Sequence, residues 1–170
     1  MSILFSSRRS QKQLAWCAAA VALLLYLKPS RRYFHVPEPA RSILAEASSW
    51  TLYALDPAMP STPLEDERLF RGFRILGQAE LTDQGLRDEL TYEFNWGVIT
   101  HSASSLCWRP RHGIRAETPS GTVDVIICFS CSGAHFAVDG EPKIFKTDTS
   151  RNPAPTFNRI FEGAGLSIAP

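Results

Sequence analysis

The chain has 170 residues, of which 44% are hydrophobic and 21% are charged, a composition typical of a globular protein rather than a disordered one. Residues 1–41 carry seven Lys and Arg against one Glu, a net charge of +6, whereas residues 42–170 carry eleven against sixteen acidic residues, a net charge of −5. Because a nucleic-acid-binding surface needs a basic face that neutralises phosphates, we expect no nucleic-acid partner for this acidic body.

An apolar run, LAWCAAAVALLLYL, occupies residues 14–27 behind a basic tail of residues 1–13. As a helix this run would span about 21 Å, short of the ~30 Å hydrocarbon core of a bilayer, so its length alone suits a signal segment. The following KPSRRYF puts charge where a signal peptidase needs small neutral residues. Six flanking Lys and Arg residues favour an uncleaved anchor over a helix buried in a globular core. We therefore expect a single-pass membrane protein that contacts the bilayer through residues 14–27 and carries an extracytoplasmic body.

Residues 28–48 are charged and contain prolines, which predicts a spacer that leads to a globular domain of residues 49–170. The domain opens with SWTLYAL, whose alternation predicts a strand over residues 49–55. One face of this strand would hold Trp50, Leu52 and Ala54, and the other Thr51, Tyr53 and Leu55. FRGFRILGQAEL, residues 70–81, is predicted to be one extended segment broken at its glycines.

From Thr82 the apolar period becomes that of a helix, which is predicted to end near Gly97. Its recurring apolar residues are Leu86, Leu90 and Phe94. Thr82 is the predicted cap, and Asp83 is placed to pair with Arg87 one turn later.

Short β-rich segments follow the helix, and the turns TPSG and VDGE between them predict antiparallel hairpins. The expected strands are 104–108, 113–117, 122–129, 135–138 and 142–146. A last helix is expected over residues 155–162, where it would bury Phe157, Ile160 and Phe161. The predicted fold is therefore α+β, an antiparallel sheet with one or two packed helices behind an N-terminal hydrophobic anchor helix.

Three of the four cysteines, Cys107, Cys128 and Cys131, crowd together with His112 and His135 into 29 residues. The CxxC pair with Cys107 and a histidine, His112 or His135, could form a tetrahedral metal site, for which zinc is the typical ion. A thioredoxin-like motif would need its CxxC at the start of a helix, and the sequence after Cys131 predicts a strand instead. A structural disulfide and buried unpaired thiols are the other two interpretations, and all four stay open.

RPRHGIR places three arginines beside His112, enough positive charge for a carboxylate or phosphate contact made by Arg109 and Arg111. The competing interpretation is intramolecular pairing with acidic neighbours such as Glu117 and Asp124. Neighbouring cations disfavour a charged imidazole, so we expect His112 to be neutral at pH 7. The aromatic set Trp50, Phe94, Trp96, Phe129, Phe157 and Phe161 is expected in the core.

The strings CWRPRHGIR and VDVIICFSC, with SWTLYALDP before them and FNRIFEGAGLSIAP after them, resemble a family of small bacterial proteins of unknown function. Many members have an amino-terminal signal or anchor, and the specific motifs are C-aromatic-x-PRHG and ICFxC. The resemblance covers about residues 50–170, and Trp108 stands where the family typically has phenylalanine. It implies no activity, cofactor or partner, but it marks the cysteines, Pro110, Arg111 and His112 as positions to test together.

The chain contains no phosphate-binding glycine loop, GxSxG elbow, HExxH helix or dinucleotide GxGxxG, so no enzyme class is indicated. We expect a membrane-anchored, non-catalytic domain that acts by binding or as a structural part. The alternative is a metal-binding or thiol-redox protein that uses Cys107, Cys128, Cys131 and His112. A third reading is a hydrolase or transferase in which His112 acts on an arginine-bound anionic substrate.

Overall fold

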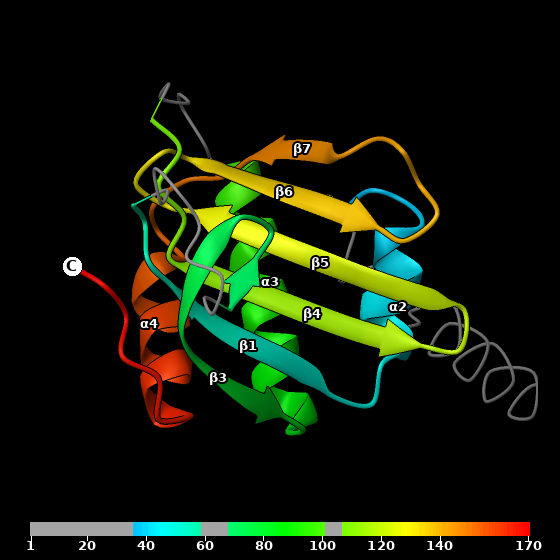
Figure 1. Cartoon of the computed structure of the whole chain (residues 1–170), viewed down its shortest axis with the longest axis horizontal. Helices are drawn as coiled ribbons and strands as arrows, with labels where there is room; N and C mark the ends of the chain where they lie inside the picture. The colour runs from blue at the N-terminus through cyan, green and yellow to red at the C-terminus, as the bar shows by residue number, and fades with distance from the viewer. Residues whose placement is uncertain (1–35, 59–67, 101–106) are drawn as a thin grey trace, which may run out of the picture. The chain divides into compact units, whose positions relative to one another are not determined.

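The structure of this chain, a computed structural model, describes residues 36–58, 68–100 and 107–170 (Figure 1). The expected anchor at 14–27 and most of the expected strand at 104–108 lie outside the described residues. Within the described part, no helix is long and apolar enough to cross a bilayer. The elements in this part are α2 (Ala40–Glu46), β1 (Trp50–Leu55), β2 (Leu69–Phe70), β3 (Phe73–Leu81), α3 (Gln84–Ile99), β4 (His112–Thr118), β5 (Gly121–Cys128), β6 (Gly133–Val138), β7 (Phe145–Asp148) and α4 (Ala154–Gly163).

The strands of the described residues form one curled antiparallel sheet in the order β2-β3-β1-β4-β5-β6-β7 (Figure 1). β1 lies between β3 and β4, so that Leu52 pairs with Ala79 on one side and with Ile114 on the other. β4 pairs with β5 across TPSG and β6 pairs with β7 after VDGE, as these turn residues predict, and β5 and β6 also pair as antiparallel neighbours. The predicted α+β class with an antiparallel sheet is confirmed, with three helices in the described residues where one or two were expected.

Strand alternation divides the buried residues between the two faces of the sheet. The larger core cluster takes Trp50, Leu52 and Ala54 from β1, whereas Tyr53 and Leu55 belong to the smaller cluster on the opposite face. β5 divides in the same way, since alternate valines and Ile127 join the larger cluster and Ile126 the smaller one. The prediction that alternate residues of these strands lie on opposite faces of the sheet is therefore confirmed.

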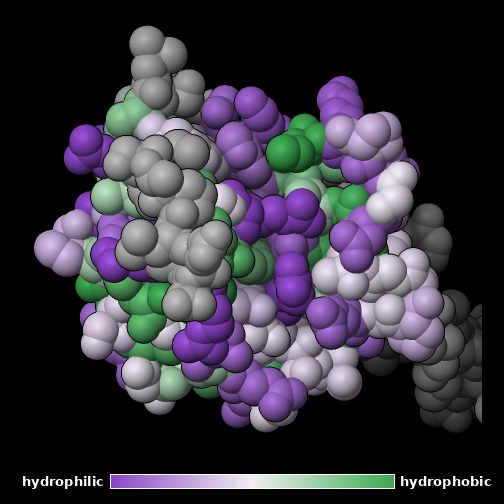
Figure 2. All heavy atoms as spheres, in the orientation of Figure 1, coloured by the Kyte–Doolittle hydropathy of each residue, from purple (hydrophilic) through white to green (hydrophobic). Residues whose placement is uncertain are grey.

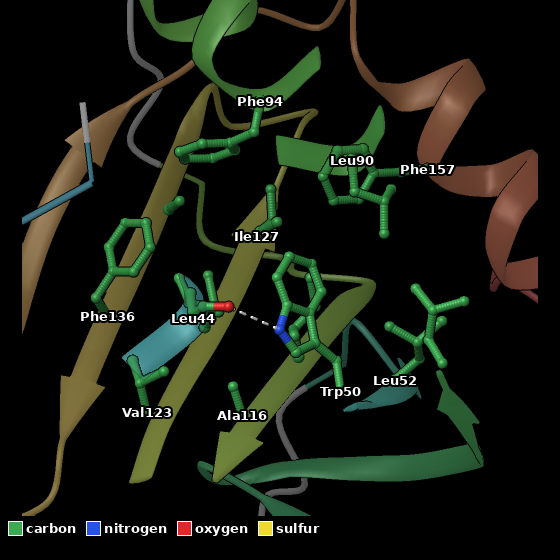
Figure 3. Close-up of a cluster of buried hydrophobic side chains, with 14 of the residues drawn as sticks. Leu44, Trp50, Leu52, Leu90, Phe94, Ala116, Val123, Ile127, Phe136 and Phe157 are labelled. Carbon is green, nitrogen blue, oxygen red and sulfur yellow. Dashed lines mark hydrogen bonds between the residues drawn. The ribbon is translucent and has the colours of Figure 1, made fainter. Parts of the chain in front are cut away.

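All three described helices contribute to the larger cluster, and Figure 3 shows part of it. Trp50 is 3% exposed, and its indole Nε1 donates a hydrogen bond of 3.3 Å to the carbonyl oxygen of Leu44 in α2. Phe157 and Phe161 of α4 are buried in the same core, as the sequence predicts. Trp96, which was expected in the core, is 49% exposed on α3.

Helix α2 places the start of the packed domain earlier than the sequence predicts. Residues 28–48 were expected to be a spacer, yet Ala40, Ile43 and Leu44 are buried in the core. The prolines and charges around this segment are typical of a linker. Its few apolar residues are buried only because the helix packs on the sheet. The core therefore includes residues from Val36 onward.

Helix α3 starts and ends one or two residues later than predicted. Its cap is Asp83, whose carboxylate accepts the amide of Leu86 at 3.0 Å, and Thr82 does not have this role. Arg87 does not pair with Asp83, because it is 4% exposed and donates to the carbonyl oxygens of Ser48 and Leu81. The helix runs through Gly97, where a side chain would meet Thr149 and Pro153 at 2.5 Å. Glycine at this position therefore lets α3 pass close to the 149–153 segment, and it does not end the helix.

Most of the segment predicted to be extended over residues 70–81 is β3, and the predicted break at Gly72 is the turn of a hairpin with β2. β2 and β3 are joined by Arg71 and Gly72, which have φ of 51° and 88°. The last strand is β7, shifted toward the C-terminus from the predicted 142–146. Both differences concern short edge strands, whose apolar patterns are weak.

The face of the sheet opposite the helices carries a buried charge cluster. Asp124 is 1% exposed, and its two carboxylate oxygens accept from Arg115 at 2.7 Å and from Arg71 at 2.6 Å. Tyr53 and Phe70 stack beside this cluster with ring centroids 4.2 Å apart. Figure 2 shows hydrophilic residues among hydrophobic ones across the middle of this face.

Candidate functional site

Cys107, Cys128 and Cys131, which are close together in the sequence, meet at the end of β5. Cys128, the last residue of β5, forms a disulfide with Cys131 in the turn that leads to β6. The thiol of Cys107 lies 3.3 Å from the sulfur of Cys131. Cys128 and Cys131 are buried, whereas Cys107 is exposed.

The segment that carries Cys107 is fixed against the CxxC turn by its backbone. The amide of Arg109 donates to the sulfur of Cys131 at 3.2 Å, and the amide of Cys131 donates to the sulfur of Cys128 at the same distance. Beside them, Trp108 stacks on His135 of β6 with ring centroids 3.8 Å apart. Cys107 and Trp108 lie in irregular chain before β4 rather than in the strand that was expected over 104–108.

His112 points into the aromatic core at the start of β4. It is 3% exposed, and its ring meets Phe129, Phe157 and Phe161 edge to face. Its Nε2 donates to the side-chain oxygen of Asn158 in α4 at 2.9 Å, since that oxygen can only accept.

His112 is neutral at pH 7, as expected, but chiefly for a different reason. Burial lowers its pKa from 6.5 to about 4, the hydrogen bond with Asn158 opposes this, and the charge of Arg111 adds to the lowering. The pKa of His135 is also lowered, first by burial and then by Lys146.

The predicted metal set of Cys107, Cys128, Cys131 and His112 stays a prediction. Two of its sulfurs are joined in the disulfide, and the imidazole nitrogen of His112 is engaged by Asn158. Among the described residues, no group of three or more His, Cys, Asp and Glu side chains is arranged to hold a metal ion.

The arginines of RPRHGIR separate into two environments. Arg115 pairs with Asp124 on the neighbouring strand, which is the intramolecular pairing that the sequence offered as an alternative to ligand binding. Arg109 and Arg111 instead line a cavity of about 380 Å³ at the other end of β4. Arg111 donates from Nε to the carbonyl oxygen of Ala169 at 3.0 Å and to a carboxylate oxygen of the last residue, Pro170, at 3.1 Å.

A third arginine, Arg151, lines the same cavity from the loop before α4. Its guanidinium donates to the carbonyl oxygen of Ser130 at 3.0 Å, and Nη1 of Arg111 donates to the Ser130 hydroxyl at 3.4 Å. His112 and Asn158 form part of the wall, and no Asp or Glu is among the described residues that line the cavity. Three guanidinium groups thus share one hollow without an acidic side chain from the described lining.

Sequence reasoning missed Arg151 and Asn158 as members of this site. Both are distant in sequence from RPRHGIR, and neither belongs to a motif that marks a binding residue. Only the topology, which packs α4 and the loop before it against the start of β4, brings them beside Arg111 and His112.

No protein-family model, no curated protein and no solved structure matches this chain.

Proposed function

We propose that this chain is a non-catalytic binding domain whose ligand is a small molecule bearing carboxylate or phosphate groups. The carrying observation is the cavity of about 380 Å³, which is lined by Arg109, Arg111 and Arg151 and by no acidic side chain of the described residues. Cavities of roughly 300 to 1,000 Å³ are typical of small-molecule sites. The bound anion would lie among the three guanidinium groups.

Electrostatics supports an anionic ligand. Guanidinium groups keep their charge at any physiological pH, so three of them around one hollow repel one another. The terminal oxygen of Pro170, which lines the same cavity, contacts Arg111 and offsets one of these three charges at most. The same domain neutralises two other arginines, Arg71 and Arg115, with the buried Asp124. The planar, forked guanidinium also matches a carboxylate or phosphate in geometry.

The three arginines have different roles in this proposal. Arg111 is held by the carbonyl oxygen of Ala169 and the terminal oxygen of Pro170, so it forms a fixed wall. Arg109 and Arg151 are more exposed at the cavity and supply the main contacts to the ligand. The neutral His112 occupies the side-chain oxygen of Asn158, which leaves the amide N–H groups of Asn158 as additional donors.

Acid–base catalysis on an arginine-bound substrate is the second candidate, because His112 lines the same cavity as the arginines. A pKa of about 4 makes this imidazole a weak base at neutral pH. Its partner is an amide rather than a carboxylate, which gives little support to an imidazolium during a reaction. Binding without reaction is therefore the better-supported function.

The membrane anchor at residues 14–27 completes the proposal and would hold the binding domain outside the cytoplasm. Its support is the apolar run with its cationic flanks. After lysis and a carbonate wash, the full-length chain is expected in the membrane fraction. Protease added to intact spheroplasts should digest the body, and full protection of the body would contradict the export.

Isothermal titration of the purified chain with inorganic phosphate and with citrate tests the binding function. Arg109→Gln and Arg151→Gln should each weaken binding by about 10- to 100-fold, because a charge-assisted hydrogen bond contributes ~1.5 to 3 kcal/mol. Arg159→Gln is the matched control, since Arg159 is an exposed arginine of α4 that pairs with Glu89. Binding that is absent, or that falls equally in the control, would contradict the proposal.

A further inference from the structure

The three sulfur atoms near the end of β5 differ in their contacts and in their exposure to solvent. Cys131 is joined to Cys128 and also lies 3.3 Å from the thiol of Cys107. This distance is within the ~3 to 3.5 Å separation of a near-attack arrangement. Because Cys107 is exposed while Cys131 is 3% exposed, the thiol reaches the disulfide from the solvent side. Cys131 is therefore the sulfur that contacts both of the others.

We propose that Cys107 exchanges with the disulfide, so that the domain has two interconverting disulfide states. The Cys107 thiol loses its proton to solvent, and the thiolate attacks the sulfur of Cys131. The bond between Cys107 and Cys131 forms as the bond between Cys128 and Cys131 breaks, and Cys128 leaves as a thiolate that takes up a proton. One disulfide and one thiol are present before and after, so the step needs no oxidant or reductant.

The surroundings of Cys128 favour its role as the leaving group. Its sulfur accepts the amide of Cys131 at 3.2 Å and lies 3.4 Å from the hydroxyl of Ser130. Hydrogen bonds to a sulfur that gains negative charge stabilise the thiolate and speed its departure.

The backbone holds the attacking segment in place. The amide of Arg109, two residues after Cys107, donates to Cys131 itself at 3.2 Å. The approach of Cys107 is thus fixed by a main-chain contact to its own target rather than by a side chain alone. This contact keeps the effective concentration of the thiol high.

Peptide mapping of the full-length chain in a Cys17→Ser background tests the exchange directly. The protein is equilibrated at pH 8, quenched in acid, alkylated in acidic denaturant and digested with trypsin. Cys107 then lies in the peptide of residues 88–111, and Cys128 and Cys131 lie together in residues 116–143. The original disulfide leaves these peptides separate, whereas the exchanged disulfide links them and leaves Cys128 alkylated.

We expect the linked pair in the Cys17→Ser chain, with the alkyl group on Cys128. Cys107→Ser should lose the linked pair completely, and Cys128→Ser should make it the main disulfide in an oxidising glutathione buffer. A Cys17→Ser chain in which Cys107 is always the alkylated residue would overturn the proposal, as would a link from Cys107 to Cys128. Because this chain with its other three cysteines intact decides the question, misfolding of a further variant leaves the test intact, and anion binding has no part in the readout.

Discussion

The buried His112 should make the stability of the domain fall steeply between pH 6.5 and pH 4. Its pKa is about 4 in the folded domain and about 6.5 in the unfolded chain, where the imidazole is exposed to water. Between pH 6.5 and pH 4 His112 is therefore protonated in the unfolded chain but not in the folded domain. The free energy of unfolding consequently decreases as the pH falls through this range. At about 1.4 kcal/mol per pH unit, the loss amounts to ~3 kcal/mol by pH 4.

Urea unfolding of the purified chain, followed by tryptophan fluorescence at pH 7.5 and 4.5, measures this loss. His112→Gln keeps a donor for Asn158 without a group that titrates in this range, so the variant should be less stable at pH 7.5 but lose less stability on acidification. His135→Gln is the matched control, because His135 is only partly buried. An equal acid-induced loss in wild type and His112→Gln would refute the reasoning.

Two further substitutions test the packing that surrounds the site. Gly97→Ala should destabilise the domain by ~1 to 3 kcal/mol in urea unfolding, because the new methyl group would meet the 149–153 segment, whereas Gly163→Ala in α4 meets nothing and should change stability by under about 0.5 kcal/mol. Asp124→Asn should cost ~1 to 3 kcal/mol, since it leaves two arginines without their carboxylate, although both are about one third exposed and regain water. Equal stability of Gly97→Ala and Gly163→Ala, or an unchanged Asp124→Asn, would contradict these contacts.

The sequence predicts those elements whose apolar pattern is long and regular. β1, β5 and α4 have such patterns, and the structure confirms their positions and the faces that they bury. The pattern fails for α2, because seven residues among prolines and charges resemble a linker until the sheet that they cover is known. It also fails for Trp96, since helical spacing alone does not say how wide the buried face of α3 is.

The candidate site was predictable only in part. Local crowding in the sequence identified the cysteines together with Arg109 and Arg111, but it could not say which groups meet. Strand alternation puts Arg115 on the face of the sheet opposite to His112, where it pairs with Asp124. His112 points into the core and contacts Asn158. The contribution of Arg151 depends on tertiary packing between segments about 40 residues apart, which no local pattern encodes.

A crystal of this chain soaked in selenate gives the most direct test of the anion-binding cavity. Selenate is a tetrahedral oxyanion like phosphate, and the anomalous scattering of selenium locates it without reference to the protein. The proposed function predicts the strongest anomalous peak within hydrogen-bonding distance of the guanidinium groups of Arg109 and Arg151. A cavity without a peak, in a crystal whose other exposed arginines bind the ion, would contradict it.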